Sequence, residues 1–324
     1  MSAPFDQRSP VEAGQQGRFA QNAGQVVIAN APVSFGAFEL TVGLMPHVPD
    51  GETVLNDVES AGYAGIDLGP LGYLGDADHI GPNLARHKLG LSGGFVELPF
   101  SDHENMPDAL RNLRAVLDVF DAAGQGIGWR PKPTLADAGS DVRRSRPGQS
   151  ARDQSLGFDA DGWRRFAAGV EMAVECCRDR GYEPTFHHET GTYVEAPWEI
   201  EKVLELTSIG LCLDTGHLLL GGGDPVQAMR DWRDRINHLH LKDARKAIVE
   251  AIVRESAPVD QIWRRGAFCR LGEGDLDVDA VLQLVRGSSY AGWVVVEQDV
   301  MPDATGNPAA DQQANREYLA ARGF

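Results

Sequence analysis

Short apolar or β-branched runs alternate with longer amphipathic segments along the chain from about residue 25 onward. This alternation is typical of βα units around a parallel sheet. The runs expected to form strands are 26–30, 65–68, 91–97, 132–136, 184–189, 209–214, 236–242 and 293–297. The segments expected to form helices include 54–61, 107–123, 162–180, 197–206, 225–235 and 278–286. Eight strands with intervening helices predict a closed (β/α)8 TIM barrel rather than an open sheet.

The length of the chain favours a single barrel domain over residues 25–324, because α/β barrels routinely reach this size as one domain. Residues 1–24 are polar and predict a disordered N-terminal extension. One long insertion, at about 137–161, carries Arg143, Arg144, Arg146 and Arg152 among Gly, Ser and Pro. It has two interpretations, a flexible solvated loop or a cationic lid over an anionic substrate, because barrel active sites lie among the loops that follow the strands.

Charge and composition exclude several classes of partner. The formal net charge of −17 argues against nucleic acid, whose binding needs clustered Lys and Arg. No stretch approaches the 18 or so apolar residues of a membrane span, and residues 1–24 lack the apolar core of a signal peptide. The four cysteines have no metal-binding spacing and no secretory context, which favours reduced thiols in the cytoplasm. A homo-oligomer is compatible with the sequence.

Four of the expected strands carry a potential metal ligand at or near their end: Glu189, Asp214, His240 and Glu297. Barrel strands are parallel and present their C-terminal ends at one face, so these four side chains are expected to share one mouth. Taken singly, an acidic residue after a strand is often a turn or helix cap, and a lone His on a strand is often a core residue. Three carboxylates buried close together, however, are costly without a cation. The set of four therefore predicts a metal site.

Three carboxylates and one imidazole suit a hard-to-borderline ion that keeps open positions. We expect one divalent ion per chain. Mn²⁺ is the first candidate, with Co²⁺, Mg²⁺ and Zn²⁺ as alternatives.

Several motifs then resemble a known group of barrels. They are LCLDTGH at 211–217, GGDP at 222–225, RINHLHLKD at 235–243, GEGD at 272–275 and GWVVVEQD at 292–299. These runs are similar to the xylose-isomerase-like, endonuclease-IV-like barrel superfamily, and within it most similar to inosose dehydratases of inositol catabolism. The HHETGT run at 187–192 resembles the histidine-rich strand end of those dehydratases, and APVSFG at 31–36 and AGYAGID at 61–67 resemble the first two strands of the family.

The resemblance implies that Glu189, Asp214, His240 and Glu297 bind the metal and that His217 faces the substrate. Related dehydratases can carry His at the position of Glu189, so that His187 and His188 compete with Glu189 for the ligand role. The implied substrate is a small keto-sugar or cyclic polyol.

A metal ion beside two glutamates predicts proton removal next to a polarised carbonyl, through an enolate. Glu189 or Glu297 would take the proton. If the proton returns to carbon, the enzyme is a keto-sugar isomerase or epimerase; if a β-hydroxyl leaves with acid help from His217, it is a dehydratase. The motif match favours an inosose dehydratase.

Two further functions are more distant. An endonuclease-IV-like DNA repair enzyme would need extra His and Asp ligands after the seventh strand, where this chain reads AFCRL at 267–271. A non-catalytic sugar-binding barrel would need no metal. For Lys242 and Asp243, a contact with a substrate oxygen and a strand-end salt bridge are equally open, and Arg270 is similarly ambiguous.

Overall fold

A closed ring of parallel strands forms the centre of the computed structural model, which describes residues 26–124, 126, 128–303 and 306–324. The strands follow the order β3-β2-β1-β11-β8-β7-β6-β5-β4 around the sheet. Their bounds are β1 Val26–Asn30, β2 Gly65–Ile66, β3 Gly90–Leu91, β4 Gly93–Leu98, β5 Lys132–Asp137, β6 Thr185–His187, β7 Gly210–Asp214, β8 Ile236–Leu241 and β11 Gly292–Val296.

Only Ser92 separates β3 from β4. The first part of this continuous segment pairs with β2 and the second part pairs with β5, so that it closes the sheet into a barrel. Counted as one strand, it completes the eight expected strands, and the predicted TIM barrel is confirmed. The expected N-terminal extension lies outside the described residues.

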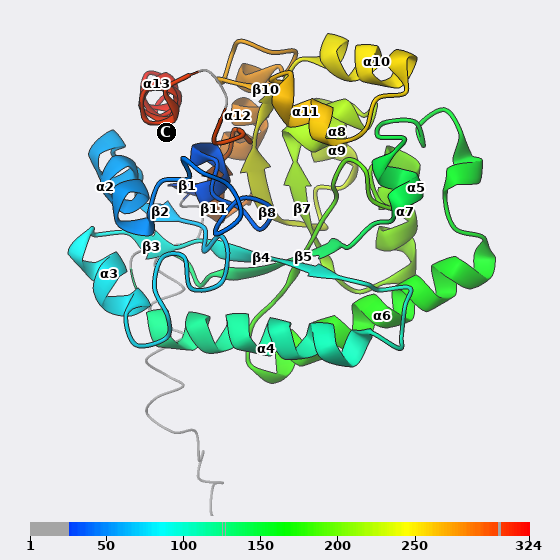
Figure 1. Ribbon diagram of the computed structural model, residues 1–324, viewed down its shortest axis with the longest axis horizontal. Coiled ribbons are helices and arrows are strands. Elements are labelled where there is room, and N and C mark those ends of the chain that lie inside the picture. The colour runs from blue at the N-terminus through cyan, green and yellow to red at the C-terminus, as the bar shows by residue number, and fades with distance from the viewer. Residues whose placement is uncertain (1–25, 125, 127, 304–305) are drawn as a thin grey trace, which may run out of the picture.

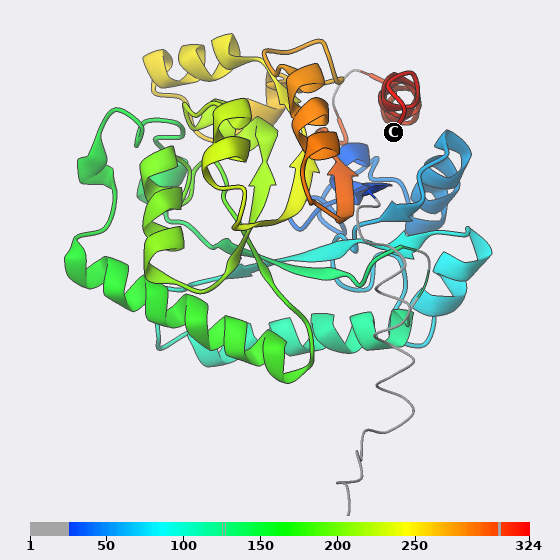
Figure 2. The same cartoon turned by 180° about the vertical axis from the view of Figure 1, so that it is seen from behind.

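Helices surround the strands on the outside, with α4 and α6 side by side along one flank and α13 against α2 (Figures 1 and 2). Six helices correspond to predicted segments: α2 Gly51–Ala61, α4 Met106–Ala123, α6 Ala160–Asp179, α7 Pro197–Leu206, α9 Pro225–Asp231 and α12 Val278–Gly287. The remaining elements were not predicted: α3 Ile80–Arg86, α5 Asp141–Arg144, α8 Thr215–Leu220, α10 Lys246–Glu255, α11 Asp260–Arg264, α13 Pro308–Ala320, the 3₁₀ turns η1 Pro32–Phe35 and η2 Gln154–Leu156, and the antiparallel pair β9 Asp243–Ala244 and β10 Phe268–Cys269.

The barrel interior holds a small apolar cluster of Ala29, Ala31, Trp293 and Val295, separate from the larger core between strands and helices. The Trp293 ring fills the space beside β2, because a Cβ on Gly65 would lie 2.5 Å from it. Glycine at position 65 therefore makes room for the indole. The polar site described below occupies the opposite, C-terminal end of the strands.

The insertion at 137–161 is anchored by a buried ion-pair network. Arg143 is fully buried, and its guanidinium reaches Glu199 at 2.7 Å and Glu195 at 3.2 Å. The Ser150 hydroxyl donates hydrogen bonds to the same two carboxylates. Arg143 is therefore neither a solvated loop residue nor part of a lid, because its charge is paired in the interior; Arg144, Arg146 and Arg152 are exposed.

None of the helices in the described part of the chain combines the length and apolar character needed to cross a membrane.

Candidate metal and catalytic site

The ends of three neighbouring strands bring Asp214, His240 and Glu297 together. A bulge between Leu211 and Cys212 sets the register that places Asp214 directly opposite His240. His240 Nδ1 lies 3.2 Å from Glu297 Oε2 and 3.8 Å from Asp214 Oδ2. All three side chains are buried. Three of the four residues expected to bind metal are therefore adjacent.

Asp214 has two roles at once. Its Oδ1 accepts a hydrogen bond from the His217 backbone N–H at 2.8 Å and caps helix α8. Its Oδ2 faces the imidazoles of His187 and His240. The cap fixes the carboxylate, because one oxygen is held by the backbone while the other remains turned to the site. The two interpretations of this residue, cap and ligand, are thus compatible.

Glu189 lies two residues beyond the end of β6 and lines the same cavity. Its Oε2 is buried without a hydrogen-bond partner, and burial raises the pKa of Glu189 to about 7. His187 lies closer to the three-residue cluster, with Nε2 3.4 Å from Asp214 Oδ2. His188 accepts the Asp214 backbone N–H and so belongs to the core. The metal-ligand role of Glu189 stays a prediction.

Lys242 is the cation at the centre of the site, a role that the sequence had left open. Its ammonium lies 3.1 Å from Asp214, 2.9 Å from Glu297 and 2.8 Å from Asp299. Burial alone would lower the pKa of Lys242, but the three carboxylates raise it well above its ordinary value. Burial alone would raise the pKa of Glu297, but His240 and Lys242 hold it below its ordinary value. These contacts therefore favour the charged forms of Lys242 and Glu297.

Asp243 and Arg270 do not join this centre. The Asp243 carboxylate accepts backbone N–H groups from the 272–276 turn, and Arg270 lies near Glu273 and Asp311. Asp243 is therefore a turn-forming residue, and Arg270 forms partly exposed ion pairs.

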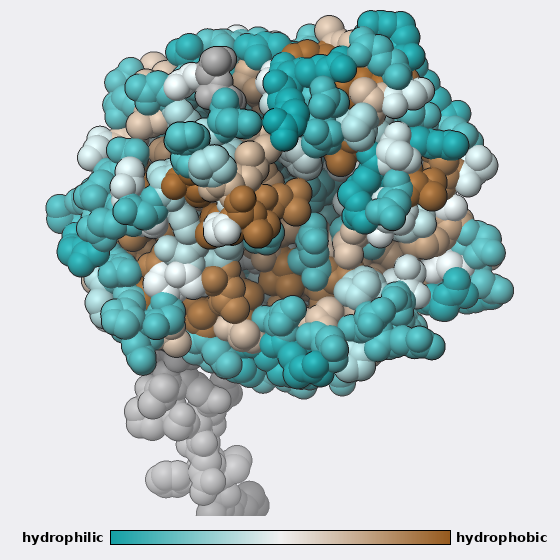
Figure 3. Space-filling view, viewed as in Figure 1, coloured by the Kyte–Doolittle hydropathy of each residue, from teal (hydrophilic) through white to brown (hydrophobic). Residues whose placement is uncertain are grey.

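A cavity of about 100 Å³ opens onto His240, Lys242 and Glu297. Its polar lining comprises Glu39, Asp67, His187, Glu189, His217, His240, Lys242, Glu297 and Asp299, and its apolar wall includes Phe38, Phe95 and Trp263. The Phe38 and Trp263 rings lie 6.1 Å apart and come from segments that follow β1 and β8. Figure 3 shows apolar side chains gathered beside a hollow near the centre of this face. The wall would shield reacting groups from water.

Sequence reasoning missed Asp67 and Asp299 as members of the site. Asp67 follows β2 directly, and burial raises its pKa to about 7. Asp299 lies two residues after Glu297, so an alternating pattern continued past the strand would have indicated it. For Asp67 the available signal was the same strand-end position that identified the predicted ligands.

His217 is among the residues that line the cavity, and its contact with a substrate stays a prediction. The Thr190 backbone N–H donates to His217 Nδ1 at 3.3 Å, so a neutral ring carries its proton on Nε2. That Nε2 lies 3.6 Å from Asp299 Oδ2. His217 could therefore present a proton from Nε2 on the side shared with Asp299.

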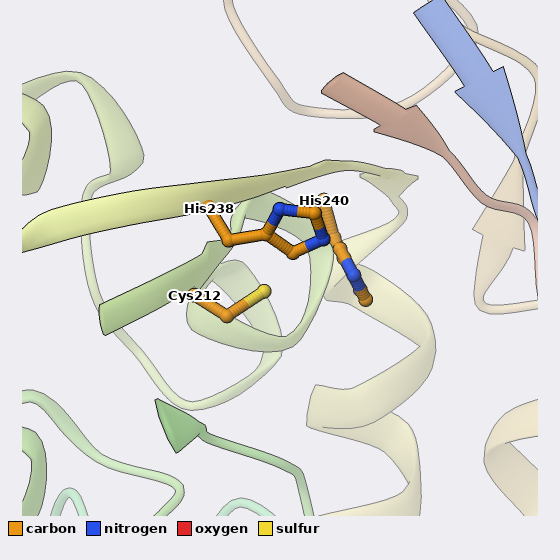
Figure 4. A group of neighbouring side chains, drawn as sticks. All are labelled: Cys212, His238 and His240. Atoms are coloured by element: carbon orange, nitrogen blue, oxygen red, sulfur yellow. The ribbon is translucent and has the colours of Figure 1, made fainter. Parts of the chain in front are cut away.

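One layer deeper in the barrel, Cys212 and His238 lie beneath His240. Figure 4 shows the three side chains turned toward one another from β7 and β8. The Cys212 sulfur and one ring nitrogen of each histidine are within 4.8 Å of one another, and all three side chains are buried. This second layer packs against the ring of His240.

The donor set fits a divalent ion. One carboxylate oxygen each from Asp214 and Glu297 and one ring nitrogen of His240 lie within 4.8 Å of one another. His187, Asp214 and His217 form a second such group, and Glu189 belongs to none of those found among the described residues. Oxygen and imidazole donors suit a hard-to-borderline ion better than a thiolate-seeking structural zinc. Asp214, His240 and Glu297 are the residues that would hold it.

The stem of Lys242 packs tightly on helix α8, which makes Gly216 a testable position. A Cβ on Gly216 would lie 2.7 Å from Lys242 Cγ and 2.9 Å from Lys242 Cβ. We expect Gly216→Ala to lower the free energy of unfolding by about 1–3 kcal/mol, the range for overpacking. Chemical denaturation would measure this change. Gly287→Ala is the control, since a Cβ there meets nothing within 4 Å; equal losses in both variants would contradict the close contact.

The fold has recognisable counterparts among known proteins. The family model described as "Xylose isomerase-like TIM barrel" matches residues 55–322. An inosose dehydratase of Geobacillus kaustophilus is 27% identical over 90% of this chain and 93% of that protein. Matches to other inosose dehydratases span about half the length of those proteins.

Two solved structures share the fold. One is the IOLI protein with a binding zinc atom, with a TM-score of 0.66, 11% identity and coverage of 91% of this chain and 97% of that chain. The other is L-ribulose 3-epimerase, with a TM-score of 0.62, 15% identity and coverage of 92% and 94%. With the family match spanning most of the sequence, the chain belongs to the xylose isomerase-like TIM barrel family.

Proposed function

We propose that this chain is a divalent-metal-dependent dehydratase that acts on a ketoinositol or a closely related cyclic keto-polyol. The observation that carries the proposal is the buried cluster of Asp214, His240 and Glu297, whose ligand atoms lie within 4.8 Å of one another beside a cavity that Glu189 and His217 also line. The similarity to inosose dehydratase over nearly the full length of that protein supports the substrate class.

The surroundings of each residue indicate its role in the proposed reaction. A bound divalent ion would polarise the substrate carbonyl and make the adjacent C–H group acidic. Glu189 suits the base, because its free oxygen faces no hydrogen-bond partner and burial raises its pKa to about 7. Glu297 is less available, because Lys242 and His240 hold its carboxylate.

His217 suits the acid that protonates the departing β-hydroxyl. Thr190 fixes its ring, and the proton on Nε2 lies on the cavity side. Asp299 would keep that ring oriented between turnovers. Phe38, Phe95 and Trp263 would exclude bulk water from the deprotonated substrate.

An isomerase or epimerase is the second candidate. Glu189 follows β6 and Glu297 follows β11, with β7 and β8 between them in the ring. Two carboxylates on different sides of one cavity could remove a proton from one face and return it to the other. The shared fold with L-ribulose 3-epimerase is compatible with this chemistry.

The test is an assay with 2-keto-myo-inositol in D₂O, with and without Mn²⁺. We expect a dehydrated dione that carries deuterium on the carbon that lost the hydroxyl, because the enol first formed takes up a solvent proton there as it becomes the dione. We also expect loss of activity with a chelator and its return with added Mn²⁺. Ultraviolet absorbance would detect the dione, and mass spectrometry would detect the deuterium. Isomerised substrate without a dione would favour the epimerase instead. Full activity after thorough chelation would contradict metal dependence.

A further inference from the structure

Lys242 contacts the same two carboxylate oxygens that face the predicted metal ligand His240. These are Asp214 Oδ2 and Glu297 Oε2, which lie 3.1 Å and 2.9 Å from the Lys242 ammonium. His240 Nδ1 is 3.8 Å and 3.2 Å from the same two atoms. An ion held by Asp214, His240 and Glu297 would therefore have the ammonium as a close neighbour.

The ammonium cannot withdraw to solvent. Lys242 is only 2% exposed, Gly216 packs against its stem, and the Phe268 ring lies 4.9 Å from its nitrogen. Asp299 is a third partner, 2.8 Å away, and it lies outside the ligand group of Asp214, His240 and Glu297. The lysine thus has one acceptor that it need not share with a metal ion.

The charge of Lys242 affects the metal-free site and the metal-bound site in opposite ways. Buried carboxylates without a counter-charge are strongly destabilising, so the ammonium stabilises the site when no metal is bound. When a divalent ion enters, the ammonium repels it, and the ion must compete for the two shared oxygens. The Lys242 ammonium therefore stabilises the metal-free site and, through the same charge, weakens the binding of a metal ion.

We propose that Lys242 is a built-in counter-cation that keeps the metal-free site folded and weakens its affinity for the divalent ion. When metal binds, the ammonium keeps Asp299 as its partner and yields Asp214 and Glu297 to the ion. This inference rests on the proposed metal-dependent function and adds to it a residue that sets metal affinity.

The test compares Lys242→Met with the unaltered chain, using Mn²⁺ as the probe in calorimetric titration and in thermal unfolding. We expect Lys242→Met to bind Mn²⁺ at least tenfold more tightly. We also expect a lower melting temperature in chelator and a larger rise on adding Mn²⁺, since a ligand that binds only the folded state stabilises it. Lys202→Met is the matched control, because Lys202 forms an exposed ion pair with Glu205. It should change neither the Mn²⁺ affinity nor the melting temperature with or without Mn²⁺.

A second variant covers the case in which Lys242→Met does not fold without metal. Lys242→Met with Asp299→Asn removes one charge of each sign, and it should also bind Mn²⁺ more tightly than the unaltered chain. Unchanged or weaker Mn²⁺ binding by a folded variant would overturn the proposal. Its failure is distinct from failure of the proposed function: tighter Mn²⁺ binding without any dehydration of ketoinositol by the unaltered chain would remove the function and leave the inference standing.

Discussion

Replacing Asp214 by Asn should abolish metal binding while leaving the fold intact. The Asn side-chain oxygen can still accept the His217 N–H, so the cap of α8 survives. The negative charge that faces His187, His240 and Lys242 disappears. We expect Mn²⁺ affinity to fall by more than about 100-fold, because outer-shell partners alone account for about 10–100-fold. Turnover should fall by about 10²–10³-fold or more, as on loss of one stabilising group.

A matched control separates the charge from the cap. Asp224 caps α9 by accepting the Val226 and Gln227 N–H groups; it is exposed and does not line the cavity. Asp224→Asn should therefore leave Mn²⁺ binding and turnover unchanged. Calorimetric titration with Mn²⁺, activity and circular dichroism on both variants provide the comparison. Mn²⁺ binding by Asp214→Asn at the affinity of the unaltered chain would refute Asp214 as a ligand.

The barrel was readable from the sequence because its strands are short continuous apolar runs buried on both faces. Among the elements that were missed, α13 lacks an apolar pattern, whereas α10 carries the amphipathic run AIVEAIV, which could have indicated it. Helix α13 buries Gln312 and Asn315, whose amides bond to Asn30, to the backbone of Leu271 and to each other. A helix that buries polar side chains shows no apolar stripe, so hydrophobic periodicity cannot indicate it.

The cluster of candidate ligands was readable for a related reason, since strand-end position alone places Asp214, His240 and Glu297 at one mouth. The role of Lys242 was not readable in the same way. The role of Lys242 depends on its contacts with three carboxylates at the ends of β7 and β11, namely Asp214, Glu297 and Asp299. It also depends on the bulge that sets the register of β7 and β8. Such pairings arise from tertiary structure, which a pattern along one strand does not contain. The arginine insertion shows the same limit, because burial separates Arg143 from its exposed neighbours.

Replacing Arg143 by Met should be the most destabilising single change outside the cavity. The substitution removes the only cation that contacts Glu195 and Glu199 among the described residues, and both carboxylates would remain buried. Breaking a buried ion pair on one side costs about 3–5 kcal/mol. We expect the free energy of unfolding to fall by that amount, as measured by chemical denaturation. Arg144→Met is the control, because its exposed pair with Asp141 should contribute less than about 1 kcal/mol.

The Arg143→Met substitution should also lower turnover at the site. Such an effect is expected if the insertion is anchored to the barrel and not if it is an independent loop. Glu195 accepts the Gly191 N–H at 2.7 Å, and Gly191 directly follows Thr190, which holds the His217 ring. Under conditions where Arg143→Met remains folded, we therefore expect lower turnover with unchanged Mn²⁺ affinity, because His217 loses its orientation while Asp214, His240 and Glu297 keep theirs. Adding Glu199→Gln should recover part of the stability, since it removes one of the uncompensated charges. Equal denaturation midpoints for Arg143→Met and Arg144→Met would show that the buried network does not anchor the insertion.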